Sequence, residues 1–388
     1  MGISTNPVFT GLPTTIFTVM SALAAEHGAI NLGQGFPDVD GPEELRRAAA
    51  AAILAGPNQY PPMMGLPALR EAVAEANRRF LGLDVDWRSE VMVTSGATEA
   101  LGDALLGLIS PGDEVIVIEP SYDSYAPMIR AAGGVPVPVR LLPPGWALPR
   151  EALAAAFGPR TRAIIVNTPM NPIAKVFTED ELRFIGELVL RHDAAIVADE
   201  VYEHLVFEGA RHVSPMTLPG LRDRVVRIGS AGKTFSMTGW KIGYVTAAPD
   251  LLDPIAKAHQ FVTFATPPHL QAAVAEGLRL PDAYFAAFAS DLRARRDRLA
   301  QGLAALGFTV LPCRGTYFLT TDTGPLGLRD DREAAQRMVV EAGVAAVPVS
   351  AFYGADAPRG WLRFCFAKRP EVLDQAVDRL ARWVRRAA

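Results

Sequence analysis

Short apolar runs alternate with longer amphipathic segments through the middle of the chain. The amphipathic segments repeat every ~3.6 residues, as at Thr98–Ile109 and Glu179–Arg191, and predict helices. Continuous apolar strands separated by helices are typical of a mostly parallel sheet covered on both faces, so the pattern predicts an α/β three-layer sandwich. The runs that predict its strands are Glu90–Thr94, Glu114–Ile118, Ala163–Val166, Ala194–Ala198, Val225–Ile228 and Ile242–Thr246.

The pattern changes near Pro281, where a smaller α+β domain is expected to begin. We predict an N-terminal arm with part of the small domain over 1–45, a large domain over 46–280 and a small C-terminal domain over 281–388. A chain of 388 residues is long enough for two or three domains. The elements expected after Pro281 are helices at Asp282–Leu306, Asp331–Ala342 and Glu371–Arg386, and strands at Phe308–Leu311, Thr316–Thr320, Ala345–Val349 and Trp361–Phe366.

Composition and charge narrow the class of protein. Hydrophobic residues make up 49% and charged residues 21%, so apolar surface is ample for large cores and disorder is excluded for most of the chain. The net charge of −4 leaves no basic excess for nucleic-acid binding. Cys313 and Cys365 lie too far apart in sequence for a metal or redox motif. No signal-peptide pattern occurs at Met1–Thr18 and no apolar run approaches the ~20 residues that span a bilayer, so we expect a cytoplasmic enzyme without a membrane partner.

The candidate functional residues come directly after the predicted strands in the sequence. Ligands of open parallel sheets bind beyond the carboxyl ends of the strands, so these positions are where a site is expected. Gly96, Ala97 and Thr98 follow one strand and open a helix, whose free backbone N–H groups and dipole favour a phosphate. Taken alone, Thr98 is equally consistent with a helix N-cap. Tyr122 follows the next strand, where an aromatic ring can stack on a flat ligand or simply pack.

Later strands are followed by an amide, a carboxylate and an amine. Asn171 lies in a proline-rich turn, and Asp199 follows its strand directly, with Tyr202 three residues further on. A carboxylate that ends an apolar run needs a cation or a donor, although a helix cap is the plain alternative. Ser230 and Lys233 follow the next strand, where a lysine among small residues can lose its proton and act as a nucleophilic amine.

Two other motifs are rejected. Ser230–Lys233 matches the S-x-x-K of serine acyl enzymes, but the partner motifs S-D-N, Y-x-N and K-T-G do not occur. Gly33 and Gly35 fail the dinucleotide fingerprint, because Asp38 stands in place of the third glycine.

The combined features suit one cofactor. A phosphorylated pyridine aldehyde uses a phosphate cradle, a stacking ring, an anionic partner for its ring nitrogen and a lysine for its aldehyde. The residues therefore predict a site for pyridoxal 5′-phosphate.

Several stretches resemble fold type I pyridoxal-phosphate aminotransferases of the class I/II group. The resemblance runs from about Leu12 to Trp383 and is strongest for the branch of kynurenine aminotransferase (glutamine transaminase K) and bacterial methionine aminotransferase. It implies a homodimer that moves an amino group from an amino acid to a 2-oxo acid by a ping-pong mechanism. The matching stretches are NLGQGFPD at Asn31–Asp38, NQY at Asn58–Tyr60, NTPMNPIAKVF at Asn167–Phe177, DEVYEHLVF at Asp199–Phe207, GSAGKTFSMTGWKIGY at Gly229–Tyr244, GTYFL at Gly315–Leu319 and RFCFAK at Arg363–Lys368.

The resemblance implies roles for the cofactor residues. Lys233 matches the lysine that binds the cofactor covalently and then moves the substrate proton. Asp199 matches the carboxylate that keeps the pyridine nitrogen protonated. Tyr202 and Asn171 match the pair that hydrogen-bonds the phenolic oxygen of the ring, and Tyr122 matches the stacking aromatic. The residues that match the phosphate site are Gly96, Ala97, Thr98, Ser230, Lys241 and, from the neighbouring subunit, Tyr60.

The resemblance also implies a substrate pocket. Arg363 matches the arginine that clamps the substrate α-carboxylate in bidentate fashion. Phe17 falls where kynurenine aminotransferases have a substrate-lining tryptophan, and the loop Phe261–Leu270, expected to reach the partner subunit, contains no Lys or Arg. These matches predict large neutral donors, namely methionine, phenylalanine, kynurenine or glutamine. The expected substrate-binding residues are Arg363, Gly35, Asn171, Phe17 and Phe264.

The sequence is also compatible with other activities. Ala174, Met170 and Ala265 each replace a residue that is common in relatives, which leaves the side-chain preference unsettled. The same scaffold supports an N-succinyl-diaminopimelate aminotransferase or a cysteine-conjugate C–S β-lyase. A cofactor-binding regulatory domain is the non-enzyme alternative, and we expect it less because such proteins usually carry a fused DNA-binding segment.

Overall fold

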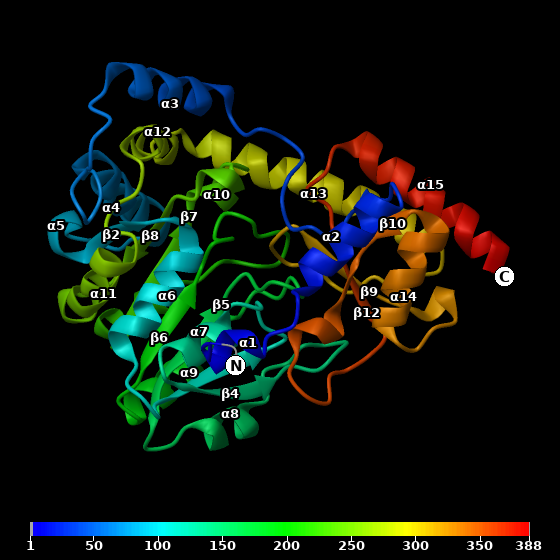
Figure 1. Ribbon diagram of the computed structural model, residues 1–388, viewed down its shortest axis with the longest axis horizontal. Helices are drawn as coiled ribbons and strands as arrows, with labels where there is room; N and C mark the ends of the chain where they lie inside the picture. Colours follow the sequence, from blue (N-terminus) through cyan, green and yellow to red (C-terminus); the bar gives the residue numbers. More distant parts are fainter. Residues whose placement is uncertain (1–2, 388) are drawn as a thin grey trace.

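The computed structural model describes residues 3–387, and a seven-stranded sheet lies at its centre (Figure 1). Its strands are β2 (Val91–Thr94), β3 (Glu114–Glu119), β4 (Val135–Arg140), β5 (Thr161–Asn167), β6 (Ala195–Asp199), β7 (Val225–Ser230) and β8 (Gly243–Thr246). They lie in the order β2-β8-β7-β6-β5-β3-β4. The strand β8 is antiparallel to both neighbours and the other pairs are parallel, which confirms the mostly parallel sheet.

Helices cover both faces of this sheet. Those on one face are α6 (Gly96–Leu108), α7 (Tyr125–Ala131) and α11 (Pro249–Val262), and those on the other are α8 (Arg150–Ala156) and α9 (Glu179–Arg191). Strand residues alternate between the two cores, since Ile165 packs with α6, α7 and α11 whereas Ile164 packs with α8 and α9. This alternation follows from the two-residue period of a strand, and it confirms the predicted three-layer α/β sandwich.

A third core covers the end of the sheet at β2 and β8. It is formed with the helices α3 (Glu43–Ala55), α4 (Pro67–Leu81), α10 (Ala231–Thr234) and α12 (Pro268–Leu278). The strand β2 follows directly from a short helix, α5 (Trp87–Glu90). Phe235, fully buried in this core, follows α10 and holds that short helix against α12.

The C-terminal part contains a smaller antiparallel sheet, with strands in the order β11-β12-β9. Its elements are β9 (Phe318–Asp322), β11 (Val347–Pro348), β12 (Trp361–Cys365), α13 (Asp282–Ala305), α14 (Asp331–Arg337) and α15 (Pro370–Ala387). The N-terminal helix α2 (Ile16–Glu26) joins the same core through Met20 and Ala24. The strand β1 (Ile30–Asn31) pairs in parallel with β10 (Val344–Ala345), so segments from both ends of the chain lie side by side.

Several details differ from the expected elements. The strand expected at Ala345–Val349 is divided between β10 and β11, which lie in different sheets. The segment Phe308–Leu311 is not a strand, because it makes only an isolated bridge from Val310 to Thr321 before Pro312, which has no N–H to continue a ladder. The helix expected to continue to Ala342 changes after α14 into a π-helical turn. The strand β4 was not predicted; its sequence VPVPVR carries prolines, which sheets tolerate at an edge such as this one.

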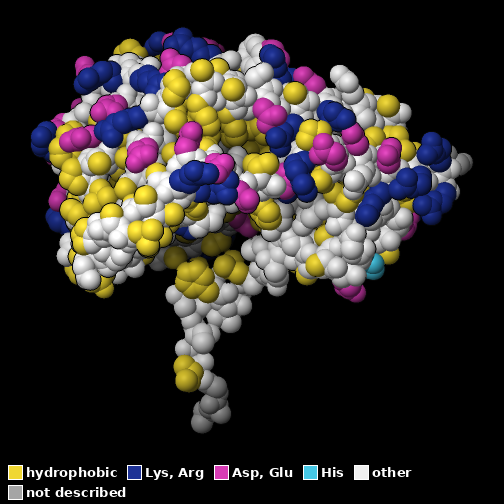
Figure 2. Space-filling view, turned by 90° about the horizontal axis from the view of Figure 1, so that it is seen from above, with side chains coloured by type: hydrophobic (Ala, Val, Ile, Leu, Met, Phe, Trp, Pro, Cys, Tyr) yellow, Lys and Arg dark blue, Asp and Glu magenta, His cyan; other side chains and the backbone are white. Residues whose placement is uncertain are grey.

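The N-terminal segment projects from the rest of the molecule (Figure 2). It contains the short helix α1 (Pro7–Thr10), and the side chain of Phe9 is exposed there. Within residues 3–387, no helix combines the length and the apolar character needed to cross a bilayer.

Candidate active site

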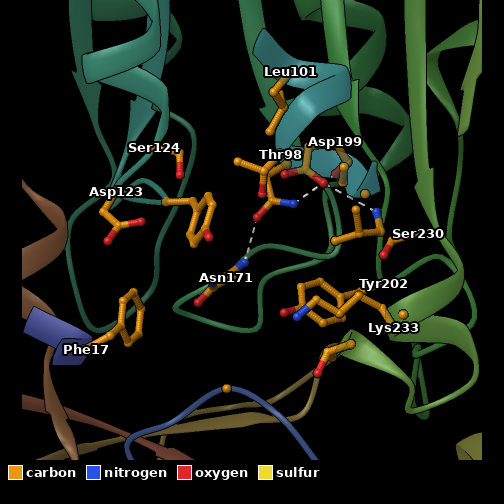
Figure 3. A pocket seen from close by; sticks show the side chains of 18 of the residues that line it. Phe17, Thr98, Leu101, Asp123, Ser124, Asn171, Asp199, Tyr202, Ser230 and Lys233 are labelled. Atoms are coloured by element: carbon orange, nitrogen blue, oxygen red, sulfur yellow. Dashed lines mark hydrogen bonds between the residues drawn. The ribbon is translucent and has the colours of Figure 1, made fainter. Parts of the chain in front are cut away.

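One cavity of about 500 Å³ opens at the carboxyl ends of the parallel strands (Figure 3). Most of the residues singled out in the sequence meet there, although they come from distant parts of the chain. Those that line the cavity are Phe17, Gly35, Gly96, Ala97, Thr98, Tyr122, Asn171, Asp199, Tyr202, Ser230, Lys233, Lys241 and Arg363. Tyr60 and Phe264 do not line it within this single chain.

The start of α6 forms a cradle of backbone at one end of the cavity. Gly96 has φ +76°, and a Cβ there would lie 3.2 Å from the Lys241 Nζ. A Cβ on Gly243 would lie 2.6 Å from the Gly96 carbonyl carbon, so only glycines allow these two segments to meet. The arrangement sets a helix N-terminus beside an ammonium group, which suits an anion.

Asp199 lies at the end of β6, where it is buried and lines the cavity. Its Oδ2 accepts a 2.5 Å hydrogen bond from the Tyr125 hydroxyl, and its Oδ1 accepts from the Val201 backbone N–H at 3.4 Å. Burial raises the pKa of the Asp199 carboxyl, while these two donors and the Lys233 ammonium oppose the rise. A cationic partner entering the cavity would therefore find a carboxylate held in place for it.

Lys233 projects into the cavity from α10, opposite Asn171. Its ammonium donates a hydrogen bond to the Tyr317 hydroxyl at 3.1 Å, and that hydroxyl donates in turn to the Gly35 carbonyl at 2.7 Å. Burial lowers the pKa of Lys233 to about 8, so much of this amine is neutral under mildly alkaline conditions. A neutral amine is a nucleophile and a base, which an ordinary surface lysine is not.

Arg363 on β12 is 0% exposed and has no carboxylate pair in the part of the chain described. Its Nη1 donates to the Asn171 Oδ1 at 2.8 Å and its Nη2 donates to the Gly33 carbonyl at 2.5 Å. Its Nε is buried without any partner. Burial lowers the pKa of this guanidinium to about 10, so an anion from the cavity would relieve an uncompensated charge.

Aromatic rings enclose the guanidinium of Arg363. The ring centroids of Phe17, Phe318 and Phe352 lie 5.1, 4.0 and 5.4 Å from its central carbon. These contacts fix the plane of the group and exclude water from it. A Cβ at Gly35 would lie 2.9 Å from the Phe318 ring, so the loop passes the arginine closely only because it carries a glycine there.

The remaining aromatic residues lie around the lysine and the carboxylate. Tyr202 is buried and meets Tyr317 edge-to-face at 5.1 Å, while Tyr122 meets Tyr125 edge-to-face at 5.8 Å. Tyr122 and Lys233 line the same cavity.

Tyr60 and Phe264 lie together on the outer surface. Their rings meet edge-to-face at 5.5 Å, and Tyr60 is 85% exposed while Phe264 is 41% exposed. The neighbouring Phe261 is 86% exposed. These positions leave the two predicted side chains outside the cavity of their own chain.

Sequence reasoning missed three residues that hold the site together. Tyr125 donates to Asp199, Tyr317 contacts Lys233, and the Asn167 side chain accepts from the Asn171 backbone N–H at 2.8 Å. Tyr317 lies within the quoted stretch GTYFL and Asn167 opens the stretch NTPMNP, so both were visible as motif members without a role. Tyr125 carries no such signal beyond its position three residues after Tyr122.

The residues that line the cavity fit pyridoxal 5′-phosphate. The glycine cradle with Lys241 suits the phosphate, the buried Asp199 suits the ring nitrogen, and Lys233 is an amine of lowered pKa. The fold and the site together define a pyridoxal-phosphate enzyme of fold type I.

Comparisons with known proteins then identify the family. The family model described as aminotransferase class I and II matches residues 27–380. The solved structure of N-succinyldiaminopimelate aminotransferase from Mycobacterium tuberculosis is 46% identical with a TM-score of 0.95, covering 98% of this chain and 100% of that chain. Methionine aminotransferase from Escherichia coli is 43% identical over 95% of this chain and 96% of its own length. Human kynurenine–oxoglutarate transaminase 1 is 37% identical over 93% and 94%.

The chain therefore belongs to the class I and II aminotransferases. It is a pyridoxal-phosphate-dependent enzyme that transfers an amino group between an amino acid and a 2-oxo acid. The named relatives act on different donors, so the family alone does not select among them.

Proposed function

We propose that the amino donor is a large neutral amino acid: methionine, phenylalanine, kynurenine or glutamine. The amino group passes to the enzyme and then to a 2-oxo acid in a ping-pong reaction. The observation that carries this proposal is the set of cationic groups around the cavity. Among residues 3–387, its basic lining residues are Lys233, Lys241 and Arg363, and each is engaged by the cofactor or by the α-carboxylate that all amino acids share.

We assign the cofactor-binding tasks as follows. Gly96, Ala97, Thr98, Ser230 and Lys241 would hold the phosphate at the start of α6, as their position around the cradle supports. The bound cofactor supplies an electron sink that stabilises negative charge at the substrate Cα.

The remaining cofactor contacts surround the ring. The buried carboxylate of Asp199 would hold a proton on the ring nitrogen, and Tyr202 and Asn171 would bind the phenolic oxygen. Tyr122 would stack on the ring. Lys233 would hold the cofactor covalently and carry the proton removed from the Cα, a task that its lowered pKa supports.

Arg363 would bind the substrate α-carboxylate. Its buried guanidinium has an unpartnered Nε, and Phe17 and Gly35 border the same part of the cavity. Every amino acid carries an α-carboxylate, so this contact does not discriminate between donors. Discrimination must come from the groups that meet the side chain.

Asp123 is one such group. It lines the cavity beside Phe17 (Figure 3), and no nitrogen of a basic side chain among residues 3–387 lies within 4.0 Å of its carboxylate. Burial raises the pKa of this carboxyl, which the positive charge of Arg363 opposes. A donor with a distal carboxylate would meet another carboxylate here, rather than a cation.

We expect methionine, phenylalanine and glutamine to exceed aspartate by at least ~10-fold in kcat/KM, a difference of about 1.4 kcal/mol in transition-state binding. The measurement is a donor panel with one common 2-oxo acid, extended to kynurenine, glutamate and N-succinyl-diaminopimelate. The variant Asp123→Asn should raise glutamate relative to its isostere glutamine by about 10-fold, because a charge repulsion is removed. A preference for aspartate in the native enzyme would contradict the pocket argument and leave the cofactor assignment standing.

An N-succinyl-diaminopimelate aminotransferase is the second candidate. The 46% identical structure carries that name, and a neighbouring cavity of about 330 Å³ shares Thr15 and Asp123 with the first. Arg332 lines this second cavity and could supply the cation that a distal carboxylate needs. If N-succinyl-diaminopimelate is the best donor in the panel and Arg332→Gln removes that preference alone, this second candidate replaces the first.

We also propose that the enzyme is a homodimer in which Tyr60 and the loop Phe261–Leu270 reach the partner's cavity. Tyr60, Phe261 and Phe264 are exposed aromatic residues that lie outside the cavity of their own chain, and the rings of Tyr60 and Phe264 meet. The projecting N-terminal arm, with Phe9 exposed, offers further apolar surface (Figure 2). We retain the domain division at 1–45, 46–280 and 281–388 as part of this proposal, supported by the core that α2 shares with the C-terminal elements.

Mixed dimers test this arrangement. Lys233→Ala and Tyr60→Ala subunits are each expected to be impaired, but their one-to-one mixture should regain about a quarter of native activity, because half of the dimers are mixed and each contains one intact site. Activity is measured after co-refolding or co-expression, with each variant mixed with itself as the control. If Tyr60 acts within its own chain, the mixture will not exceed the mean of the two parents.

A further inference from the structure

A buried histidine lies behind the cradle, outside the cavity. His259 of α11 is fully buried, and α11 lies against α6 (Figure 1). Its Nδ1 is 2.8 Å from the Glu99 Oε1, and its Nε2 is 3.0 Å from the Met63 carbonyl oxygen. A carbonyl can only accept, so Nε2 carries a proton. An ionised Glu99 can also only accept, so Nδ1 carries one too, and the ring is an imidazolium.

Glu99 creates an electrostatic problem for an anion site. It belongs to the first turn of α6, and its Oε2 accepts the backbone N–H of Ser95, the residue that precedes the helix. The helix end contributes only about half a positive charge, whereas an ionised carboxylate contributes a full negative one. Without compensation, Glu99 would therefore weaken the attraction of this turn for a phosphate.

Asp103 adds to the negative charge one turn further along α6. It is 0% exposed, and its Oδ2 lies 3.6 Å from the His259 Nδ1. Neither of its carboxylate oxygens has a hydrogen-bond partner in the described structure. Burial opposes a charge on His259, but the nearby carboxylates of Asp103 and Glu99 raise its pKa to about 9. Burial also raises the pKa of Asp103.

The same histidine ties two loops to the helix start. The Met63 carbonyl belongs to the segment that carries Tyr60, and the His259 carbonyl accepts the Phe264 backbone N–H at 2.9 Å. His259 thus connects the first turn of α6 with the two segments that carry Tyr60 and Phe264.

We propose that His259 is a positioning residue whose positive charge neutralises Glu99 and so maintains the phosphate affinity of the α6 N-terminus. The inference rests on the proposed placement of the cofactor phosphate at that turn. It predicts that the contribution of His259 is specific for the phosphate group and follows the charge of Glu99.

The test compares pyridoxamine 5′-phosphate with pyridoxamine, which lacks the phosphate, by equilibrium titration of the cofactor-free full chain. Neither ligand can react with Lys233, so binding is measured apart from catalysis. In His259→Asn an amide N–H can replace Nδ1 but the charge is lost. This variant should bind pyridoxamine 5′-phosphate about 10-fold more weakly and pyridoxamine less than ~3-fold more weakly. The double variant Glu99→Gln/His259→Asn should recover to within ~3-fold of the native affinity for the phosphate form.

Two further variants separate the outcomes. His212→Asn breaks another histidine–carboxylate contact, between His212 Nε2 and Glu200 Oε2 at 3.0 Å. It should lower the melting temperature without changing the ratio of the affinity for pyridoxamine 5′-phosphate to the affinity for pyridoxamine. Lys241→Gln should lower that ratio, because the Lys241 ammonium lies at the cradle.

If Lys241→Gln lowers the ratio and His259→Asn does not, the inference is wrong and the phosphate site stands. If neither variant changes it, the phosphate lies elsewhere and both assignments fail. A His259→Asn effect without recovery in the double variant would also overturn the charge argument.

Discussion

Replacing Lys233 with alanine is expected to abolish the visible absorbance band that arises from covalent attachment of the cofactor to this lysine, and to reduce transamination by about 10²–10⁴-fold or more, because the variant loses both the covalent attachment and the base. The structure supports this magnitude. Lys233 combines a pKa of about 8 with a hydrogen bond to Tyr317 that aims its amine into the cavity. The measurements are the absorbance spectrum after purification with excess cofactor and the rate of 2-oxo acid formation.

Lys241→Ala is the matched control for that experiment, since it removes the other lysine of the cavity. We expect it to weaken cofactor binding while the visible band persists at saturating cofactor. Unchanged absorbance and turnover in Lys233→Ala would show that Lys233 is an ordinary lysine of a glycine-rich turn, and the proposed mechanism would have to be abandoned.

Asp199→Asn should leave the cofactor bound but slow removal of the Cα proton by about 10²–10³-fold. The amide has nearly the same size as the carboxylate, so Tyr125 and Val201 keep a partner of similar shape. A neutral amide cannot stabilise a positive charge on the ring nitrogen, and the electron sink is weakened. Exchange of the Cα hydrogen of methionine with D₂O, followed by NMR, measures this step directly.

Tyr125→Phe serves as the control for Asp199→Asn. It removes the hydroxyl that donates to Asp199 but retains the carboxylate, so we expect a much smaller loss of rate. The competing interpretation is that Asp199 only caps the turn after β6, which is worth about 1 kcal/mol of stability. A normal exchange rate with only a lowered melting temperature would support that interpretation.

The large sheet was predictable because its strands are buried on both faces. Apolar runs such as Ile164–Val166 have no alternative to a covered strand, and the amphipathic segment Glu179–Arg191 forms α9 with the same bounds. Prediction failed where the local signal was ambiguous. The prolines of β4 argue against a strand except at an edge, and sequence does not show which strand lies at the edge.

Residues of the candidate site were predictable where a strand end or a motif marked them. Asp199 and Lys233 directly follow strands that end at one edge of the sheet, so their meeting followed from the topology. Arg363 has no such local signal, and only the family resemblance singled it out. Tyr125 was missed because its hydroxyl is committed to a carboxylate 74 positions further along the chain.

The sequence by itself determined the class of fold, the cofactor and the family, because strand periodicity, chain order and the residues after each strand are local properties. The tertiary structure decided how those residues act. Burial lowers the pKa of Lys233, three aromatic rings enclose Arg363, and His259 meets Glu99 from 160 positions away. Each effect depends on dielectric surroundings and on contacts between segments that are distant in the chain, and these exist only once the two ends and the central sheet have packed together.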